Sequence, residues 1–285
     1  INMFSKLAIL FFAFLQLSNG VPLETDKLKN DLKSFFSPRI VGGVDAPYGF
    51  SRYMTALVWG YPVSSLVCGG SIITKRHVLS AAHCIEPFVH WGELSPSFRG
   101  VIGTNYWNAT HTKIQFCGYK NHPGWNWANI KNDVGLLITA SDIQFNHLVT
   151  PIALSSEWVA GGQRGLVTGW GRLGVWQNIP YRLQILFVTI LSPEQCYRYM
   201  EKAQQIWGFG PPVHAAVEIC TLHSVGHGMC HGDSGSALVY KNKQVGIVSW
   251  GYPCALGAPD VFVRISAFNG FIEDTIREYN CCGHD

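Results

Sequence analysis

Short apolar runs, separated by Gly, Pro and Asn, follow one another along the chain beyond residue 40. Runs of roughly four to eight residues bounded by such turn residues are typical of β-strands. They lie at residues 55–59, 71–74, 78–81, 135–138, 166–168, 183–190, 237–240, 245–250 and 261–265. Many short strands at this spacing predict an all-β barrel or sandwich.

Two segments break the strand pattern and predict helices. Ser192 precedes Pro193, the order of a helix cap and a first helical residue, and this helix is expected to run toward Ile206. A second helix is expected to begin near Ser266 and to dock the end of the chain. Its apolar residues recur at helical spacing and predict a core-facing stripe: Phe268, Phe271, Ile272, Ile276 and Tyr279.

The N-terminal part of the chain has the pattern of a secretory signal. Nine apolar residues, 7–15, follow Lys6 and give way to small and polar residues at 18–20. In a helix they would span roughly 13 Å, less than half the core of a bilayer. We therefore expect a signal peptide over residues 1–20, with Met3 as the initiator and residues 1–2 as upstream read-through. A buried N-terminal helix is the alternative.

Composition excludes several classes of protein. Of 285 residues, 47% are hydrophobic and only 14% are charged, which does not suit an intrinsically disordered chain. The net charge of +3 comes without long basic runs, so no nucleic-acid partner is expected. After export the nine cysteines enter an oxidising compartment and are expected to form disulfides. Because nine is odd, at least one cysteine has no partner within the chain.

Three separated segments hold side chains that could make a serine reactive. Residues 232–236 place Ser234 between two glycines, which permits a tight turn whose amides can bind an oxyanion. Alone, this motif is as consistent with an ordinary turn. Residues 81–84 supply His83 and residues 132–137 supply Asp133. A serine hydroxyl needs an imidazole to take its proton, and the imidazole needs a carboxylate to fix its tautomer.

These segments, together with residues 40–43 (Ile-Val-Gly-Gly), 168–171 and 249–251, resemble the chymotrypsin and trypsin family of serine endopeptidases over nearly all of residues 40–280. The resemblance implies two six-stranded antiparallel β-barrels, at about 40–155 and 156–265, and a C-terminal helix at about 266–280, within a peptidase domain of residues 40–285. It implies Ser234 as nucleophile, His83 as general base and then acid, and Asp133 as the orienting carboxylate. The amides of Gly232 and Ser234 would form the oxyanion hole.

The family is made as an inactive precursor, which gives the polar segment of residues 21–39 a meaning as an activation propeptide. A trypsin-like protease would cut after Arg39 and free the α-ammonium of Ile40. That ammonium would enter the protein and pair with Asp233. Because either charge alone is costly to bury, the pair could order the oxyanion loop and switch activity on.

Six cysteines match the family's placements, which imply the pairs Cys68–Cys84, Cys196–Cys220 and Cys230–Cys254. Cys117, Cys281 and Cys282 have no counterparts in that pattern. Since the family fold brings the terminal helix near the strand around Cys117, we expect a bridge from Cys117 to Cys281 or Cys282. The remaining thiol is either free or paired with a second molecule.

The resemblance assigns the walls of a specificity pocket to the residues before Ser234 and to Ser249, Trp250 and Gly251. Trypsin-like enzymes carry Asp six residues before the nucleophile, where this chain has Gly228. Asp260 stands on the other wall, where many relatives have Gly. This combination resembles the brachyurin branch of broad-specificity, chymotrypsin-like arthropod enzymes. Alternatively, Asp260 makes only a structural hydrogen bond; a preference for basic, aromatic or aliphatic residues stays open.

No metal site and no cofactor are expected, because the histidines are scattered and no carboxylate lies near Thr104 to bind calcium. The sequence therefore predicts a secreted, extracellular and monomeric digestive endopeptidase, with the gut lumen as a candidate location. Its partners would be protein or peptide substrates, an activating trypsin-like protease and protein inhibitors, with no membrane in the mature form. The alternatives are a catalytically silent homologue with a binding or regulatory role, and a clotting or immune-cascade protease. Glycosylation at Asn108 stays open.

Overall fold

The computed structural model describes residues 40–110, 112–208, 210–252 and 254–278. The chain divides after residue 37, and described residues belong to the second unit alone. The expected signal peptide, propeptide and Arg39 lie outside the described residues. Among the helices of the described part, none has the length and apolar character needed to cross a bilayer.

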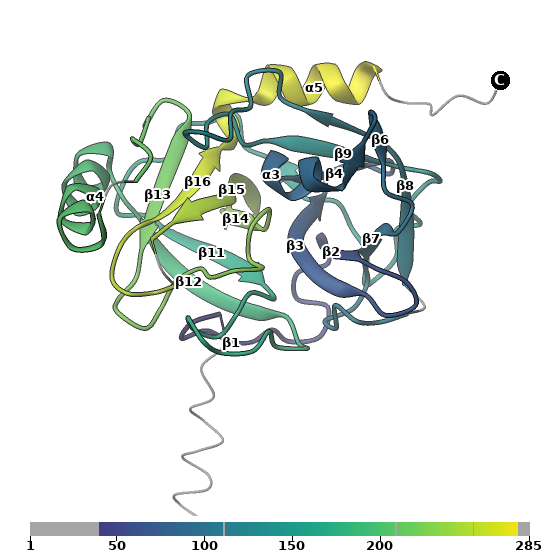
Figure 1. The fold of residues 1–285 in the computed structure, drawn as a ribbon, viewed down its shortest axis with the longest axis horizontal. Helices are drawn as coiled ribbons and strands as arrows, with labels where there is room; N and C mark the ends of the chain where they lie inside the picture. The colour runs from purple at the N-terminus through teal and green to yellow at the C-terminus, as the bar shows by residue number, and fades with distance from the viewer. Residues whose placement is uncertain (1–39, 111, 209, 253, 279–285) are drawn as a thin grey trace, which may run out of the picture. The chain divides into compact units, whose positions relative to one another are not determined.

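The first half of the unit is a closed antiparallel barrel of six strands (Figure 1). Neighbouring strands pair side by side around the ring, and their inward side chains form one apolar core. In ring order the strands are β2 (Met54–Trp59), β3 (Ser65–Ile72), β4 (His77–Ser80), β9 (Gly135–Thr139), β8 (Lys113–Asn121) and β7 (Phe98–Val101).

The second half is a further antiparallel ring of six strands, closed by pairing between its first and last members at Thr189–Leu222 and Ile190–Thr221. The predicted fold of two six-stranded barrels is therefore confirmed. The ring order is β12 (Gln184–Ile190), β11 (Arg164–Gly169), β14 (Ala237–Tyr240), β15 (Lys243–Gly251), β16 (Asp260–Arg264) and β13 (Glu218–Leu222). Two short strands extend this sheet: β1 (Val44–Asp45) on β12, and β10 (Ala153–Leu154) parallel to β15.

The remaining elements are short pieces around the barrels. They are α3 (Ala82–Ile85), the 3₁₀ helices η1 (Glu86–Phe88) and η2 (Ile265–Ala267), and the hairpin of β5 (Val89–His90) and β6 (Glu93–Leu94).

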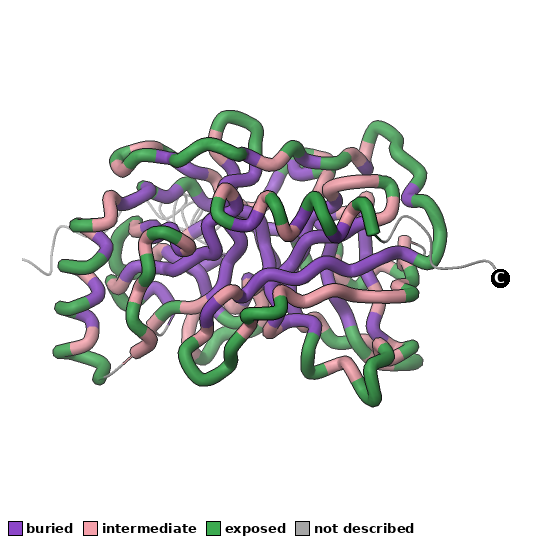
Figure 2. The backbone as a smooth tube through the Cα atoms, turned by 90° about the horizontal axis from the view of Figure 1, so that it is seen from above, coloured by how far each residue is buried: buried purple, intermediate pink, exposed green. Residues whose placement is uncertain are grey.

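Both predicted helices form, and each buries one face (Figure 2). Helix α4 (Pro193–Trp207) begins with a capping box, in which the Ser192 hydroxyl accepts from the amide of Gln195 and the Gln195 side chain accepts from the amide of Ser192. Helix α5 (Asn269–Glu278) follows η2 and buries Ile272 in the core of the first barrel.

The strand boundaries differ most from the predictions at β3, which begins at Ser65, and three strands of the barrels were not predicted; nor were the short strands β1, β5, β6 and β10. β3 ends at Ile72, because the Thr74 hydroxyl accepts hydrogen bonds from the amides of Arg76 and His77 and closes a turn there. The missed strands β7, β8 and β13 do not read as apolar runs. Arg99 interrupts β7, no residue of β8 is fully buried, and Glu218 opens β13.

Three disulfides link segments of the two barrels and their helices. Cys68–Cys84 joins β3 to α3, Cys196–Cys220 joins α4 to β13, and Cys230–Cys254 joins two loops of the second barrel. These are the pairs that the resemblance implies. Cys117 is also disulfide-bonded; its predicted partners, Cys281 and Cys282, lie outside the described residues.

Buried polar groups join the two barrels, and two of these contacts hold β3 against the second barrel. The Ser71 hydroxyl on β3 donates to the Gln244 side chain on β15 over 2.7 Å. The amide of Gly69 on β3 donates to the carbonyl of Ser234 over 2.7 Å. The turn that holds Ser234 is therefore fixed to the first barrel, which also supplies His83 and Asp133.

Candidate active site

His83 lies on the single turn of α3, directly after the buried end of β4. Its backbone amide donates to Oδ1 of Asp133 over 2.9 Å, and its Nδ1 lies 2.7 Å from Oδ2 of the same carboxylate. A carboxylate can only accept here, so Nδ1 carries the hydrogen. Nε2 is thereby left with a lone pair that can accept a proton.

Asp133 is 1% exposed and accepts a third hydrogen bond, from the Ser249 hydroxyl to Oδ2 over 2.6 Å. Sequence reasoning assigned Ser249 only to the wall of the pocket, and this second role was missed. The residue before Asp133, Asn132, has φ +55°, a left-handed conformation that asparagine tolerates better than most residues. The turn aims the carboxylate at His83.

Ser234 lies in a tight turn whose glycines are required by close contacts. A Cβ on Gly235 would lie 2.2 Å from the Ser80 hydroxyl and 2.3 Å from the carbonyl of Gly69. Gly232 has φ +99°, where a side chain would be strained. Among the described residues, hydrogen bonds join His83 to Asp133, but none joins His83 to Ser234. Such bonds are often long in free enzymes and tighten when substrate binds.

The backbone around Ser234 offers unpaired amides. The carbonyl of His231 accepts from the amide of Arg172 over 2.8 Å. Because a trans peptide directs its N–H opposite to its C=O, the Gly232 amide points away from that bond. Neither Gly232 nor Ser234 donates its amide to a carbonyl within the described backbone. Two donors are thus free to bind an oxygen beside Ser234.

Asp233 is completely buried behind this turn. Its carboxylate accepts from the amides of Gly171 over 2.8 Å and Cys230 over 3.0 Å. Burial nevertheless raises the pKa of Asp233 to about 7, because desolvation outweighs the two hydrogen bonds. Ile40 is also fully buried, and the carbonyl of Val41 accepts from the amide of Gly228 over 3.0 Å.

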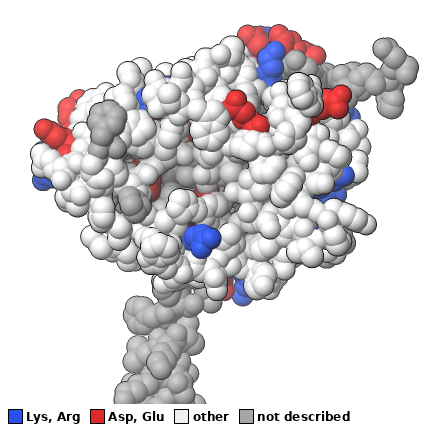
Figure 3. All heavy atoms as spheres, in the orientation of Figure 1, with Lys and Arg blue, Asp and Glu red and all other residues white. Residues whose placement is uncertain are grey.

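Beside Ser234 lies a cavity of about 480 Å³. In Figure 3 the face between the two barrels is hollowed, and its surroundings carry few charged side chains. The predicted wall residues Ser249, Trp250 and Gly251 line this cavity, and Asp260 lies in it together with Ser234. A side chain that enters the cavity would therefore bring its own backbone close to Ser234.

The carboxylate of Asp260 lies against Gly228. A Cβ at Gly228 would approach Oδ2 of Asp260 to 2.9 Å, so a glycine there leaves room for this carboxylate. Oδ2 accepts from the amide of Met229 over 3.1 Å. Asp260 therefore makes a structural hydrogen bond and also lines the cavity; its role in binding basic side chains stays a prediction. Burial, and secondarily the charge of Asp233, raise the pKa of Asp260 to about 7.

Comparisons with known proteins agree with this geometry. The family model described as Trypsin matches residues 40–272. The chain belongs to the trypsin family. It is 35% identical to chymotrypsin-2 of Vespa crabro over 82% of this chain and 98% of that protein. It is 31% identical to trypsin alpha-4 of Lucilia cuprina and to trypsin beta of Drosophila erecta, over 82% of this chain and 86% and 87% of those proteins.

As a member of this family, the chain is a serine endopeptidase, and one cluster near its active site could be mistaken for a metal centre. Cys68, His83 and Cys84 bring three potential ligand atoms within 4.8 Å of one another. The two cysteines form a disulfide, however, and a disulfide sulfur is not the thiolate that binds metals. The cluster therefore fits no metal.

Two neighbours of the site escaped sequence reasoning in this trypsin-family chain. Trp127 places its ring edge-on to His83, with centroids 6.3 Å apart. Glu218 and Lys131 form a buried ion pair behind Trp250. The sequence carried a signal for the ion pair. Glu218 is the one charged residue within the segment 217–220, and a buried carboxylate needs a partner.

Proposed function

We propose that this trypsin-family enzyme cleaves peptide bonds with Ser234 as nucleophile, His83 as general base and acid, and Asp133 as the carboxylate that orients His83. The observation that carries the proposal is the 2.7 Å contact between Nδ1 of His83 and the buried Asp133, beside a cavity that Ser234 lines. This arrangement leaves Nε2 of His83 available as a base.

The proposed reaction is acyl transfer in two halves. Oγ of Ser234 attacks the scissile carbonyl while its proton moves to Nε2 of His83, and the resulting oxyanion accepts hydrogen bonds from the amides of Gly232 and Ser234. His83 then gives the proton to the leaving amine, and the C–N bond breaks to leave an ester on Ser234. A water molecule repeats the attack with the same base and releases the acid. Asp133 stays ionised and stabilises the imidazolium that forms twice.

Maturation is proposed to follow cleavage between Arg39 and Ile40. The new α-ammonium of Ile40 would pair with Asp233, whose buried carboxylate accepts hydrogen bonds from two uncharged backbone amides. The uncompensated burial of this group supports the proposal, because a nearby cation would remove a desolvation cost. The activator would be a trypsin-like protease, since the bond follows an arginine.

Primary specificity is proposed to be broad and chymotrypsin-like. Asp260 offers a carboxylate for part of a basic side chain, while the space beside Gly228 leaves room for aromatic or aliphatic ones. The names of the similar proteins support a mixed preference, since one is called a chymotrypsin and two are called trypsins. We further propose a secreted, monomeric digestive enzyme that protein inhibitors can bind.

The test labels tryptically activated protein with a fluorophosphonate and then measures kcat/KM for peptides with Phe, Leu or Arg before the scissile bond. The expected result is one label per chain, lost in Ser234→Ala, and cleavage after all three residues. A correctly folded protein that takes no label would instead be a catalytically silent binding or regulatory homologue. Rejection of every Arg peptide would remove Asp260 from substrate recognition.

A further inference from the structure

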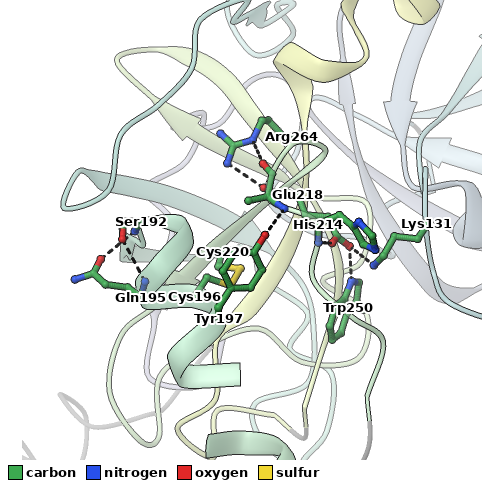
Figure 4. The surroundings of a disulfide bond; sticks show 11 residues. Lys131, Ser192, Gln195, Cys196, Tyr197, His214, Glu218, Cys220, Trp250 and Arg264 are labelled. Atoms are coloured by element: carbon green, nitrogen blue, oxygen red, sulfur yellow. Dashed lines mark hydrogen bonds and ion pairs between the residues drawn. A yellow bond between two sulfur atoms is a disulfide. The ribbon is translucent and has the colours of Figure 1, made fainter. Parts of the chain in front are cut away.

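A buried ion pair joins the loop before Asp133 to the start of β13 (Figure 4). Nζ of Lys131 lies 2.7 Å from Oε1 of Glu218, and the two side chains are only 9% and 5% exposed. A buried pair of this kind recovers little more than its own desolvation cost. A gain in stability therefore does not explain why the protein buries these two charges.

The same carboxylate also holds the side chain of Trp250. The indole Nε1 donates to Oε1 of Glu218 over 2.9 Å, and Oε2 accepts from the amide of His214 over 2.6 Å. Nζ of Lys131 lies 5.2 Å from the centre of the Trp250 ring. Glu218 thus contacts both a lysine of the Asp133 loop and an aromatic wall of the cavity, and Figure 4 shows the three side chains converging.

A second contact lies beside the first, two residues after Lys131 on one segment and one residue before Trp250 on the other. Ser249 precedes Trp250 on β15 and donates its hydroxyl to Asp133. Residues 131–133 are therefore fixed to residues 249–250 at two points, one direct and one through Glu218. β13 itself is anchored, because Cys220 is bonded to α4 through the disulfide to Cys196.

The backbone around Lys131 is strained, so that contacts must hold it. Ile130 has φ +50° and Asn132 has φ +55°. A β-branched residue such as isoleucine is rarely found in the left-handed region, and it persists there only where surrounding interactions fix the backbone. The ion pair at Lys131 lies between these two residues and supplies such an interaction.

We propose that Lys131 and Glu218 are positioning residues that couple the cavity wall at Trp250 to the placement of Asp133; the inference rests on the proposed function. Neither residue touches the reacting atoms. Glu218 orients the indole, and Lys131 fixes the loop that presents Asp133 to His83. Loss of the ion pair should weaken substrate binding, because the indole of Trp250 is no longer held in place. Loss of an ion pair outside the cavity should not weaken substrate binding.

The experiment is a double-mutant cycle between Lys131→Met and Trp250→Phe, with active sites counted by fluorophosphonate and KM and kcat measured on a Phe peptide. Lys131→Met is expected to raise KM about tenfold in the wild type but less than about threefold in Trp250→Phe, because Lys131 acts through the indole. Lys131→Arg, which keeps the charge, should restore KM to within about threefold of the wild type. The matched control is Arg76→Met, which removes an ion pair with Asp142 outside the cavity and should leave KM unchanged.

Additive effects in the cycle, or an equal rise of KM in Arg76→Met, would overturn the inference while leaving the proposed function intact. Absence of hydrolysis in the activated wild type would overturn the proposed function and this inference with it. If Lys131→Met does not fold, Lys131→Gln takes its place in the same cycle, because it keeps a donor for Glu218 without the charge.

Discussion

At the scale of single residues, we predict that the protonation of Asp260 governs which side chains the cavity accepts. Its pKa is raised to about 7, chiefly by burial, so the group changes charge near neutrality. We expect kcat/KM for an Arg peptide, divided by that for a Phe peptide, to rise about tenfold between roughly pH 6 and pH 8. The ratio cancels any pH effect that both substrates share, and the pH dependence of kcat/KM reports the free enzyme.

The control for this prediction is Asp260→Asn, which keeps an acceptor for the amide of Met229 but cannot ionise. Its ratio should be low and flat across the same pH range. If the wild-type ratio does not change with pH, or if the asparagine variant retains the change, another group governs the choice between basic and aromatic residues.

At the scale of elements, the cap of α4 is a local interaction with a separable effect on stability. Ser192→Ala removes the hydroxyl that accepts from the Gln195 amide, which should lower the free energy of unfolding by about 1 kcal/mol. Thermal unfolding measures the change, and kcat/KM per titrated active site should not move because α4 lies outside the cavity. Ser192→Asp keeps an acceptor and should unfold as the wild type does; a loss as large as that of alanine would contradict the capping role.

Helices and strands could be predicted where consecutive residues carry the pattern that specifies them. The capping residues of α4 and the apolar run of β12 carry their structure in consecutive residues, and both elements were predicted. β13 was not predicted, because it opens with the charged Glu218, whose buried partners include Lys131, 87 residues earlier in the chain. β8 was missed because its residues are partly buried or exposed and form no apolar run.

The candidate site divides in the same way. Motif residues such as His83 and Ser234 could be found from their short segments, and so could the disulfide partners that the resemblance implied. The second role of Ser249 could not, because its bond to Asp133 joins residues 116 positions apart and depends on how the two barrels meet. Contacts between barrels leave no periodic pattern in a single sequence.

At the scale of the whole molecule, the buried charge of Asp233 should make the precursor and the mature form respond differently to pH. The pKa of Asp233 is raised from 3.8 to about 7 by burial. Its contribution to stability is therefore fully present below pH 3.8 and is lost as the pH rises through about 7, because the unfolded chain ionises first. In the mature form, an α-ammonium at Ile40 would favour the ionised carboxylate and lower its pKa, which removes most of this loss.

Asp260 has a raised pKa as well, but its first cause is burial, which both forms share, so the difference between the forms reports mainly Asp233. With Ser234→Ala protein to prevent self-digestion, we expect the precursor to lose up to about 3 kcal/mol more than the trypsin-cleaved form between roughly pH 5 and pH 8. Thermal unfolding of both forms across this range measures the difference. Parallel pH profiles of the two forms would mean that the new amino terminus does not reach Asp233. The control is Arg39→Gln, which blocks the cut and should keep the precursor profile after trypsin treatment.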